Sequence, residues 1–495
     1  MRKGRTARWR RRRAACIQSR PLNVGRPCTD LAWTNLRSWC KEQGLPKTKL
    51  TLAYFSDTFR GMMATRDIGQ GEDVVRVPER LLITASKVKQ ATLARAAVAG
   101  GSIQSDCWDL SEHQSLAYWV YVEAELQDHS EWYSYIRSLP RDFASIPLFV
   151  LSGNSPSGMV DTTSSDCVQW VAAHLPHSLR QRVSEQQSRL FGDWSHTRAS
   201  PVVSRSRPVS NWRLYVWSWL VVSTRCIHLG RRPGSTRHVH TTDTSSSRGA
   251  HSIGSQDSIT LAPMLDLLNH SQHASISTLF DTDRREFVIK TIRPFKAGQE
   301  VFISYGPHDN LFLLAEYGFV LGQNPYQHLE LDHAAELWVA AAKARMQGLK
   351  RVAPARLADI DMLVDMLKQR GLWGDFALLP GDTEPPYRLQ SALRLLLAVE
   401  QQEIPLKRAI AQWERWRRGE PEGTESNGLD IATSSWIRAA CQGLVSVSAR
   451  MLNDTGAMDH NALRDLGDAR PSAFLVHCIH TVWLEISTIA AHHCA

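Results

Sequence analysis

Two β-rich parts of the sequence contain the same kind of turn, although a long segment of helical character separates them. The first turn runs from Ile68 to Glu72 and the second from Phe295 to Glu300. Each turn has an apolar residue, two connecting residues, a glycine and then an acidic residue. Two related β units interrupted in sequence predict one β domain that folds from both parts. The intervening segment is then an insertion, expected at about residues 110–255.

Short strands are predicted next to both turns. Val74 to Val77 indicate a strand that ends at Pro78, since proline cannot continue a ladder of hydrogen bonds. After the insertion, three apolar runs indicate further strands, at Ile259–Leu261, Phe287–Ile289 and Val301–Ile303.

Apolar residues at helical spacing predict a helix before the first strand and several helices in the insertion. The predicted insertion helices are Ser111–Leu126, Pro176–Leu190 and Trp212–Leu229. Residues Ser195 to Ser210 have no clear periodicity. Residues 230–257 are rich in Ser, Thr, His and Gly, and are predicted to form a disordered surface loop.

The C-terminal third of the sequence has helical periodicity throughout. Leu389, Leu393, Leu396 and Leu397 form its clearest stripe. Because leucines at this spacing pack in cores, residues 330–490 are predicted to form a separate all-α domain. The expected fold class is therefore α+β, with an irregular β core, a helical insertion and an all-α C-terminal domain.

The excess positive charge is confined to the N-terminus. The chain has 58 Lys and Arg against 49 Asp and Glu, a net charge of +9, and residues 1–20 contain nine cations and no acid. The rest of the chain is neutral overall and has no net attraction for nucleic acid. Arg10 to Arg13 are typical of a nuclear-import or nucleic-acid patch, with a solvated arm or a mitochondrial presequence as alternatives. We expect a basic disordered arm over residues 1–28.

The cysteines and the apolar runs indicate a reducing compartment and no membrane. The nine cysteines are scattered, without a Cys-x-x-Cys pair, which argues against a zinc site and a disulfide framework. The longest strongly apolar run, Leu214 to Val222, is too short to cross a bilayer. We expect no metal, no membrane partner, and a soluble chain that is not secreted.

Three segments place polar residues where a β core would have apolar ones. They are Phe59–Ala64, Leu265–Ser271, and Ile303–Gly306 followed by Glu316–Val320. Each has an ordinary structural explanation when taken alone: a tight turn at Gly61, a helix C-cap at Asn269, or a strand end. The order and spacing of the three segments along the chain indicate that they should be interpreted together.

Together the three segments resemble the SET-domain protein methyltransferases, of the type represented by the plant Rubisco large-subunit methyltransferase. The resemblance is carried by LAPMLDLLNHS at 261–271, EVFISYGPHDN at 300–310 and LAEYGFVLGQNP at 314–325. It covers residues 30–328 well and the helical part loosely. It implies a pseudoknot-like β SET core over 29–328, an all-α substrate-binding domain, and S-adenosylmethionine-dependent methylation of a lysine in a protein.

The resemblance also implies roles for individual residues. Tyr305 would stand at the methyl-transfer centre, Tyr317 and Phe319 would line the lysine channel, and Asp266 would support the loop of Asn269. The expected contacts of S-adenosylmethionine are the backbone of Arg60, Gly61 and Met62, together with Arg225, Asn269 and His270.

Lysine methylation has physical requirements that these residue types meet. The amine must be neutral to attack, although its usual pKa is about 10.4. An apolar, aromatic channel and a neighbouring sulfonium both lower that pKa. Aromatic rings also tolerate the cation that forms as methyl groups are added.

The sequence departs from the family at two positions: Phe59 stands where the family has glycine, and Ser223 where it has asparagine. The resemblance leaves lysine or histidine as acceptor, because one branch of the group methylates histidine. The alternatives are a catalytically degenerate scaffold that binds peptides or chromatin, and an RNA-binding enzyme that uses the arm. We expect a monomer with a protein substrate, such as a histone tail, in the nucleus and cytoplasm, and nucleic-acid contact only through the arm.

Overall fold

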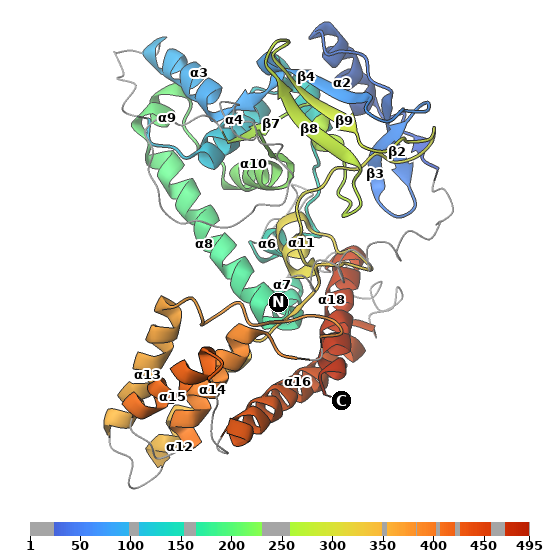
Figure 1. Cartoon of the computed structure of the whole chain (residues 1–495). Coiled ribbons are helices and arrows are strands. Elements are labelled where there is room, and N and C mark those ends of the chain that lie inside the picture. Colours follow the sequence, from blue (N-terminus) through green and yellow to red (C-terminus); the bar gives the residue numbers. More distant parts are fainter. Residues whose placement is uncertain are drawn as a thin grey trace. The chain divides into compact units, whose positions relative to one another are not determined.

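A computed structural model of the chain describes most residues after the N-terminal arm (Figure 1). The described residues are 24–98, 108–152, 165–229, 258–348, 354–382, 384–401, 406–420, 426–456 and 471–494. Most of the predicted arm and the whole predicted loop over 230–257 lie outside them. The chain divides into two compact units: unit 1 is Met1–Arg141 with Leu190–Pro307, and unit 2 is Asp142–Arg189 with His308–Ala495. The domain boundaries given above stay a prediction.

The described residues of unit 1 form three small antiparallel sheets. Their orders are β1-β2-β3, β4-β9-β8 and β5-β7-β6, so the second and third sheets each combine strands from before and after the insertion. The strands are β1 (Arg26–Pro27), β2 (Leu50–Phe55), β3 (Phe59–Ala64), β4 (Asp73–Pro78), β5 (Ile83–Thr84), β6 (Ile227–His228), β7 (Ile259–Leu261), β8 (Ile276–Asp281) and β9 (Glu286–Thr291).

The two similar turns lie next to each other in unit 1 and are joined by backbone hydrogen bonds. Ile68 and Phe295 form an antiparallel bridge in which each backbone N–H donates to the other residue's carbonyl, at 2.9 and 3.0 Å. Gly71 and Gly298 both have positive φ, +76° and +85°, which glycine adopts without steric cost. The turns therefore join the two β units directly.

Within unit 1, the insertion helices α4 and α10 pack on each other, and α4 also contacts strands β5 and β7 (Figure 1). Trp39 and Trp119 both pack on Trp132, with ring centroids 5.2 and 5.3 Å apart. The helices whose described residues lie wholly in this unit are α2 (Leu31–Glu42), α3 (Ala85–Val98), α4 (Glu112–Leu126), α5 (Tyr133–Ser138), α9 (Pro201–Ser206) and α10 (Trp212–Arg225).

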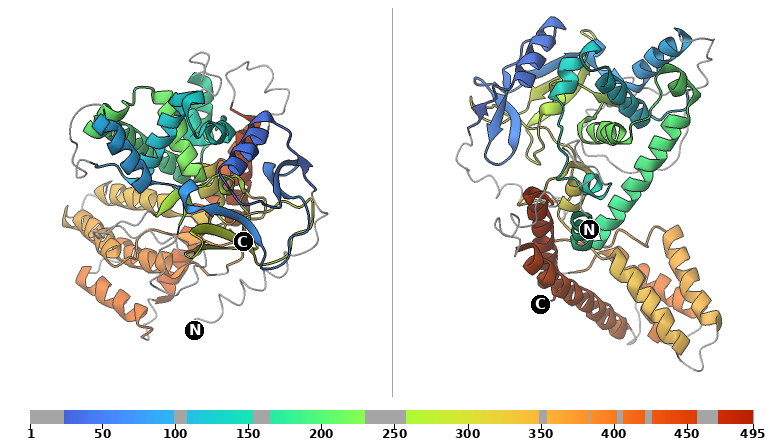
Figure 2. Two further views of the ribbon diagram at one scale, coloured as in Figure 1. Left: turned by 90° about the horizontal axis from the view of Figure 1, so that it is seen from above. Right: turned by 180° about the vertical axis from the view of Figure 1, so that it is seen from behind.

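Unit 2 is almost entirely helical, and α16 packs along α18 within it (Figure 2). Its sheet content in the described residues is one pair of two-residue strands, β10 (Leu329–Glu330) with β11 (Ala377–Leu378). Its helices are α6 (Pro147–Leu151), α7 (Ser165–His174), α11 (Asn310–Tyr317), α12 (Asp332–Gly348), α13 (Pro354–Gln369), α14 (Tyr387–Gln401), α15 (Leu406–Arg417), α16 (Ser426–Gly456) and α18 (Ala473–His492). The α+β fold class is confirmed.

Four local predictions are wrong. Arg26–Pro27, in the arm expected to be disordered over 1–28, form strand β1 and pair with β2. The helix expected over Trp212–Leu229 ends at Arg225, and Ile227–His228 form strand β6. Val301–Ile303 is not a strand: Glu300 bridges Met63 and Ile303 bridges His270, so the segment pairs with two different neighbours and forms no continuous ladder. Residues 195–210 are largely helical, because α8 (His177–Ala199) continues past Leu190 and α9 follows it. Thr197 is fully buried in α8 and its hydroxyl pairs with that of Tyr215, so a polar residue continues the buried stripe.

One described helix, α18, is long and apolar enough to cross a membrane, and half of its most apolar stretch is buried in the structure. The same helix carries Glu485, whose carboxylate accepts hydrogen bonds from the Asn310 amide at 2.8 and 3.0 Å. Its packing on α16 and this buried polar contact are typical of a core helix.

Candidate active site

The site forms where β3 passes against the loop that follows β7. A Cβ atom at Gly61 would lie 2.0 Å from Glu300 Oε1 and 2.9 Å from Asn269 Nδ2. Only glycine therefore allows these three segments, far apart in sequence, to touch. The neighbouring Phe59 has φ of +58° and a side chain that is 64% exposed.

Asn269 is held in one orientation by its two amide hydrogens. Its Nδ2 atom donates to the backbone carbonyl of Arg60 at 2.7 Å and to Glu300 Oε1 at 2.8 Å. An amide has two N–H groups and one oxygen, so the polar atom that remains to meet a ligand is Oδ1, which can only accept.

Tyr305 is fixed at both ends beside this loop. Its hydroxyl donates to the carbonyl of Leu268 at 2.9 Å, and its backbone N–H donates to Nδ1 of His270 at 3.0 Å. The two rings stack, with centroids 5.1 Å apart and planes inclined by 26°. Burial raises the pKa of the Tyr305 hydroxyl to about 12, so the phenol stays protonated at neutral pH.

Asp266 is buried beneath the loop and supports it. The Tyr135 hydroxyl donates to its Oδ2 atom at 2.6 Å, and Arg225 Nη1 donates to its backbone carbonyl. Burial raises the pKa of Asp266 to about 6, although Arg225 and the Tyr135 hydrogen bond oppose that rise. Burial also raises the pKa of Tyr135.

A pocket of about 270 Å³ opens beside these residues in unit 1. Its two charged lining residues are both arginines, and the other lining residues are neutral. The lining consists of Leu52, Thr58, Phe59, Arg60, Pro140, Arg225, Leu267 and Asn269.

The structure brings most of the sequence-predicted residues together. Arg60, Arg225 and Asn269 line the pocket, and the residues that touch this wall or its loop are Gly61, Asp266, His270 and Tyr305. The carbonyl of Met62 accepts a hydrogen bond from the N–H of Val301 at 2.8 Å, so that carbonyl is already used within the fold.

Tyr317 and Phe319 belong to unit 2, at the end of α11. Their ring centroids lie 6.2 Å apart in a tilted arrangement. Between them, Gly318 ends α11 with φ of +76°, and a Cβ there would lie 2.6 Å from Ser145 Oγ. Their role as a lysine channel stays a prediction.

Sequence reasoning missed three polar residues of the site: Thr58, Tyr135 and Glu300. Thr58 Oγ1 donates to Glu300 Oε2 at 2.5 Å. A signal for Glu300 was available, because its carboxylate directly precedes the apolar run Val301–Ile303. No local pattern marks Tyr135, which meets Asp266 across a separation of 131 residues.

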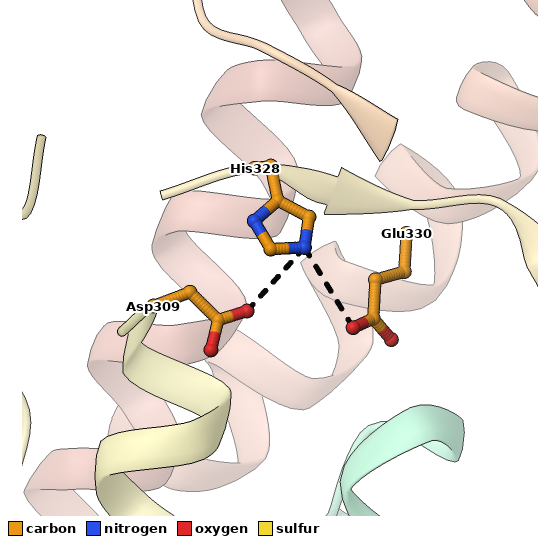
Figure 3. Close-up of side chains that lie close together, drawn as sticks. All are labelled: Asp309, His328 and Glu330. Carbon is orange, nitrogen blue, oxygen red and sulfur yellow. Dashed lines mark ion pairs between the residues drawn. The ribbon is translucent and has the colours of Figure 1, made fainter. Parts of the chain in front are cut away.

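A second polar cluster lies in unit 2 and joins Asp309, His328 and Glu330 (Figure 3). His328 Nε2 is 3.5 Å from Asp309 Oδ2 and 3.7 Å from Glu330 Oε1. Burial alone would lower the pKa of His328, but Glu330 and Asp309 raise it to about 9. The three donor atoms lie within 4.8 Å of one another, as cation ligands do, but a charged imidazole between two carboxylates already explains the cluster.

Comparisons with known proteins agree with this geometry. Residues 60–306 match the family model of the SET domain. Mouse SET domain-containing protein 4 is 29% identical over 406 residues, 80% of this chain and 78% of that protein. Ribosomal lysine N-methyltransferase set11 of Schizosaccharomyces pombe is 26% identical over 300 residues, 60% of this chain and 64% of that protein.

Actin-histidine N-methyltransferase of Drosophila melanogaster is 24% identical over 327 residues, 66% of this chain and 56% of that protein. Among solved structures, the SET domain of LSMT bound to lysine and AdoHcy has a TM-score of 0.54 at 15% identity, covering 94% of this chain and 91% of that one. The family match, the relatives and the shared fold agree that residues 60–306 of this chain are a SET domain.

Proposed function

We propose that the chain is an S-adenosylmethionine-dependent protein methyltransferase that transfers methyl groups to a lysine side chain. One observation carries the proposal: the segments of Arg60, Asn269 and Tyr305 converge beside one pocket, through contacts of 2.7 to 3.0 Å.

The pocket residues suit the polar end of the cofactor. The guanidinium of Arg225 is a partner for a carboxylate, and the Oδ1 atom of Asn269 is an acceptor for an ammonium group. Bound S-adenosylmethionine would supply the methyl group from a positively charged sulfur. His270 is 5% exposed, and its ring stacks on that of Tyr305.

The reaction depends on the alignment of the amine with the methyl group more than on a strong catalytic acid or base. The neutral amine nitrogen attacks the methyl carbon, the carbon–sulfur bond breaks, its electron pair stays on sulfur, and the amine proton leaves to solvent. The Tyr305 hydroxyl donates its hydrogen to the carbonyl of Leu268, so its oxygen can still accept a hydrogen bond from an amine bound beside it. An oxygen held in this way stabilises the positive charge that develops on the amine.

Lysine as acceptor is supported by the lysine enzymes among the relatives and by the lysine bound in the LSMT structure. The actin-histidine relative makes histidine the second candidate. For the protein that is methylated, we propose a histone tail or a non-histone protein, reached in the nucleus or cytoplasm. Fusion of residues 1–20 to a fluorescent protein tests the nuclear part: even distribution between compartments would contradict it.

The proposal is tested by methyl transfer with Tyr305→Phe. Full-length protein is incubated with cell extract and S-adenosylmethionine that carries a tritiated methyl group, and labelled proteins are hydrolysed to identify the methylated amino acid. We expect methyl-lysine from wild type and a loss of about a hundredfold or more in Tyr305→Phe.

Tyr118→Phe is the matched control, because the buried Tyr118 hydroxyl also donates to a backbone carbonyl, that of Arg207 at 3.1 Å. This control should keep wild-type transfer. Equal labelling by wild type and Tyr305→Phe would refute the role of the hydroxyl, and methyl-histidine as product would refute the lysine acceptor.

A catalytically degenerate scaffold is the second candidate, and one observation favours it. Phe59 lines the pocket with a positive φ, a conformation in which a bulky residue is strained. A scaffold of this kind would bind no S-adenosylmethionine at millimolar concentration in a calorimetric titration.

A further inference from the structure

The charges that line the pocket suit the carboxylate of S-adenosylmethionine but not its net positive charge. Both charged lining residues, Arg60 and Arg225, are positive, and no acidic side chain belongs to the lining. S-adenosylmethionine has a sulfonium and an ammonium against one carboxylate, so it carries a net positive charge. A pocket with two guanidinium groups therefore needs a negative charge close by to hold this ligand.

Glu300 lies directly behind the pocket wall. Its Oε2 atom accepts a hydrogen bond from the Thr58 hydroxyl at 2.5 Å, and its Oε1 atom accepts one from Asn269 Nδ2 at 2.8 Å. Thr58 and Asn269 both line the pocket. Glu300 is 8% exposed and reaches the ligand space only through these two side chains.

The hydrogen bonds of Glu300 leave its negative charge uncompensated. Thr58 and Asn269 are neutral donors, and no ion pair joins Glu300 to a cation in the part of the chain that the structure describes. Burial raises the pKa of the Glu300 carboxyl, which reflects the cost of an unpaired buried charge. A cation bound in the pocket would recover part of that cost.

We propose that Glu300 is the counter-charge of the pocket and makes it prefer the cationic methyl donor over the product, S-adenosylhomocysteine. The inference rests on the proposed function. The two ligands differ by one methyl group and one positive charge, so a fixed negative charge strengthens the binding of the donor and not of the product. The same carboxylate orients the Asn269 amide, which affects both ligands equally.

These two effects are separable by measuring both ligands in each variant. Isothermal calorimetry on the full-length chain gives dissociation constants for S-adenosylmethionine and S-adenosylhomocysteine. In Glu300→Gln, which keeps the shape and removes the charge, we expect the preference for the donor to fall about tenfold. In Glu300→Asp, which keeps the charge, we expect the preference to stay within about twofold of wild type.

Glu123→Gln serves as the control, because Glu123 is also buried and accepts a hydroxyl hydrogen bond, from Ser130 at 2.7 Å, outside the pocket. It should leave the preference unchanged. An equal weakening of both ligands by Glu300→Gln would overturn the proposal and leave Glu300 as a support for Asn269.

Glu300→Gln and Glu300→Asp each test the proposal independently. If Glu300→Gln fails to fold, as judged by circular dichroism, a loss of preference in Glu300→Asp overturns the proposal, and a retained preference supports it. If wild type binds neither ligand, the proposed function fails as well, and this outcome differs from a change in preference alone.

Discussion

At the scale of single residues, the candidate site depends on a close approach of three chain segments. Gly61 provides the space, Glu300 occupies it, and Asn269 is oriented by both the carboxylate and the Arg60 carbonyl. Gly61, Asn269 and Tyr305 were predicted from the resemblance of their three segments to the SET-domain family, and the structure brings those segments together. Tyr135 was not predictable, because its partner Asp266 is distant in sequence and no local rule joins them.

Gly61→Ala should disrupt this approach. The new methyl group would lie 2.0 Å from Glu300 Oε1, so the buried carboxylate must move. We expect the free energy of unfolding to fall by about 1–3 kcal/mol, the usual cost of overpacking, with weaker binding of S-adenosylmethionine.

The measurement is urea denaturation together with ligand titration. Gly192→Ala is the control, because nothing lies within 4 Å of a Cβ at that exposed position in α8. It should stabilise the helix by about 0.5–1 kcal/mol. A Gly61→Ala variant as stable as Gly192→Ala would contradict the packing described for the site.

At the scale of elements, the predictions failed where hydrogen bonds or polar burial replaced an apolar pattern. Val301–Ile303 has the composition of a strand, but Val301 N–H donates to Met62 and Ile303 N–H to Asn269, so the segment connects two neighbours. In α8, the buried stripe includes Gln186 and Thr197, which hydropathy alone does not detect. Strands that pair with neighbouring strands along their whole length, such as β4 and β9, were predicted well.

In unit 2, the start of α11 and strand β10 are joined by polar contacts. Asp309 caps α11 through the Phe312 N–H at 2.8 Å and also pairs with His328, whose second carboxylate partner is Glu330. The charged imidazole of His328 neutralises the buried carboxylate of Asp309 and the partly buried carboxylate of Glu330. Loss of the imidazole would leave both negative charges without a partner.

His328→Gln should therefore destabilise unit 2 in a pH-dependent way. The folded pKa of His328, about 9, is above its usual value of 6.5, so its contribution is fully present below pH 6.5 and disappears as the pH rises through 9. We expect a loss of about 1–3 kcal/mol in the free energy of unfolding near pH 6, and a smaller difference from wild type near pH 10.

Denaturation curves at both pH values check this expectation. The control is His129→Gln, since the His129 side chain is 85% exposed and should contribute nothing measurable. A difference between wild type and His328→Gln that is the same at both pH values would show that His328 is uncharged in the folded protein.

At the scale of the whole molecule, the candidate pocket belongs to one compact unit that is assembled from both sides of the insertion. Residues 58–60 come before the insertion, Arg225 lies within it at the end of α10, and Asn269 comes after it. The repeated turn made this joining of distant segments predictable, because two β units of one kind complete a single core. The division of the helical residues between the units was not predictable, since helical periodicity is alike in both.

The central claim is that these distant segments form one binding site for S-adenosylmethionine. Calorimetric titration of the full-length chain and of Asn269→Ala tests it most directly. The account predicts saturable binding by wild type and a dissociation constant at least about tenfold higher for Asn269→Ala, which loses the acceptor oxygen and the link to Arg60. Equal affinity in both proteins, or no binding by wild type at millimolar ligand, would contradict it.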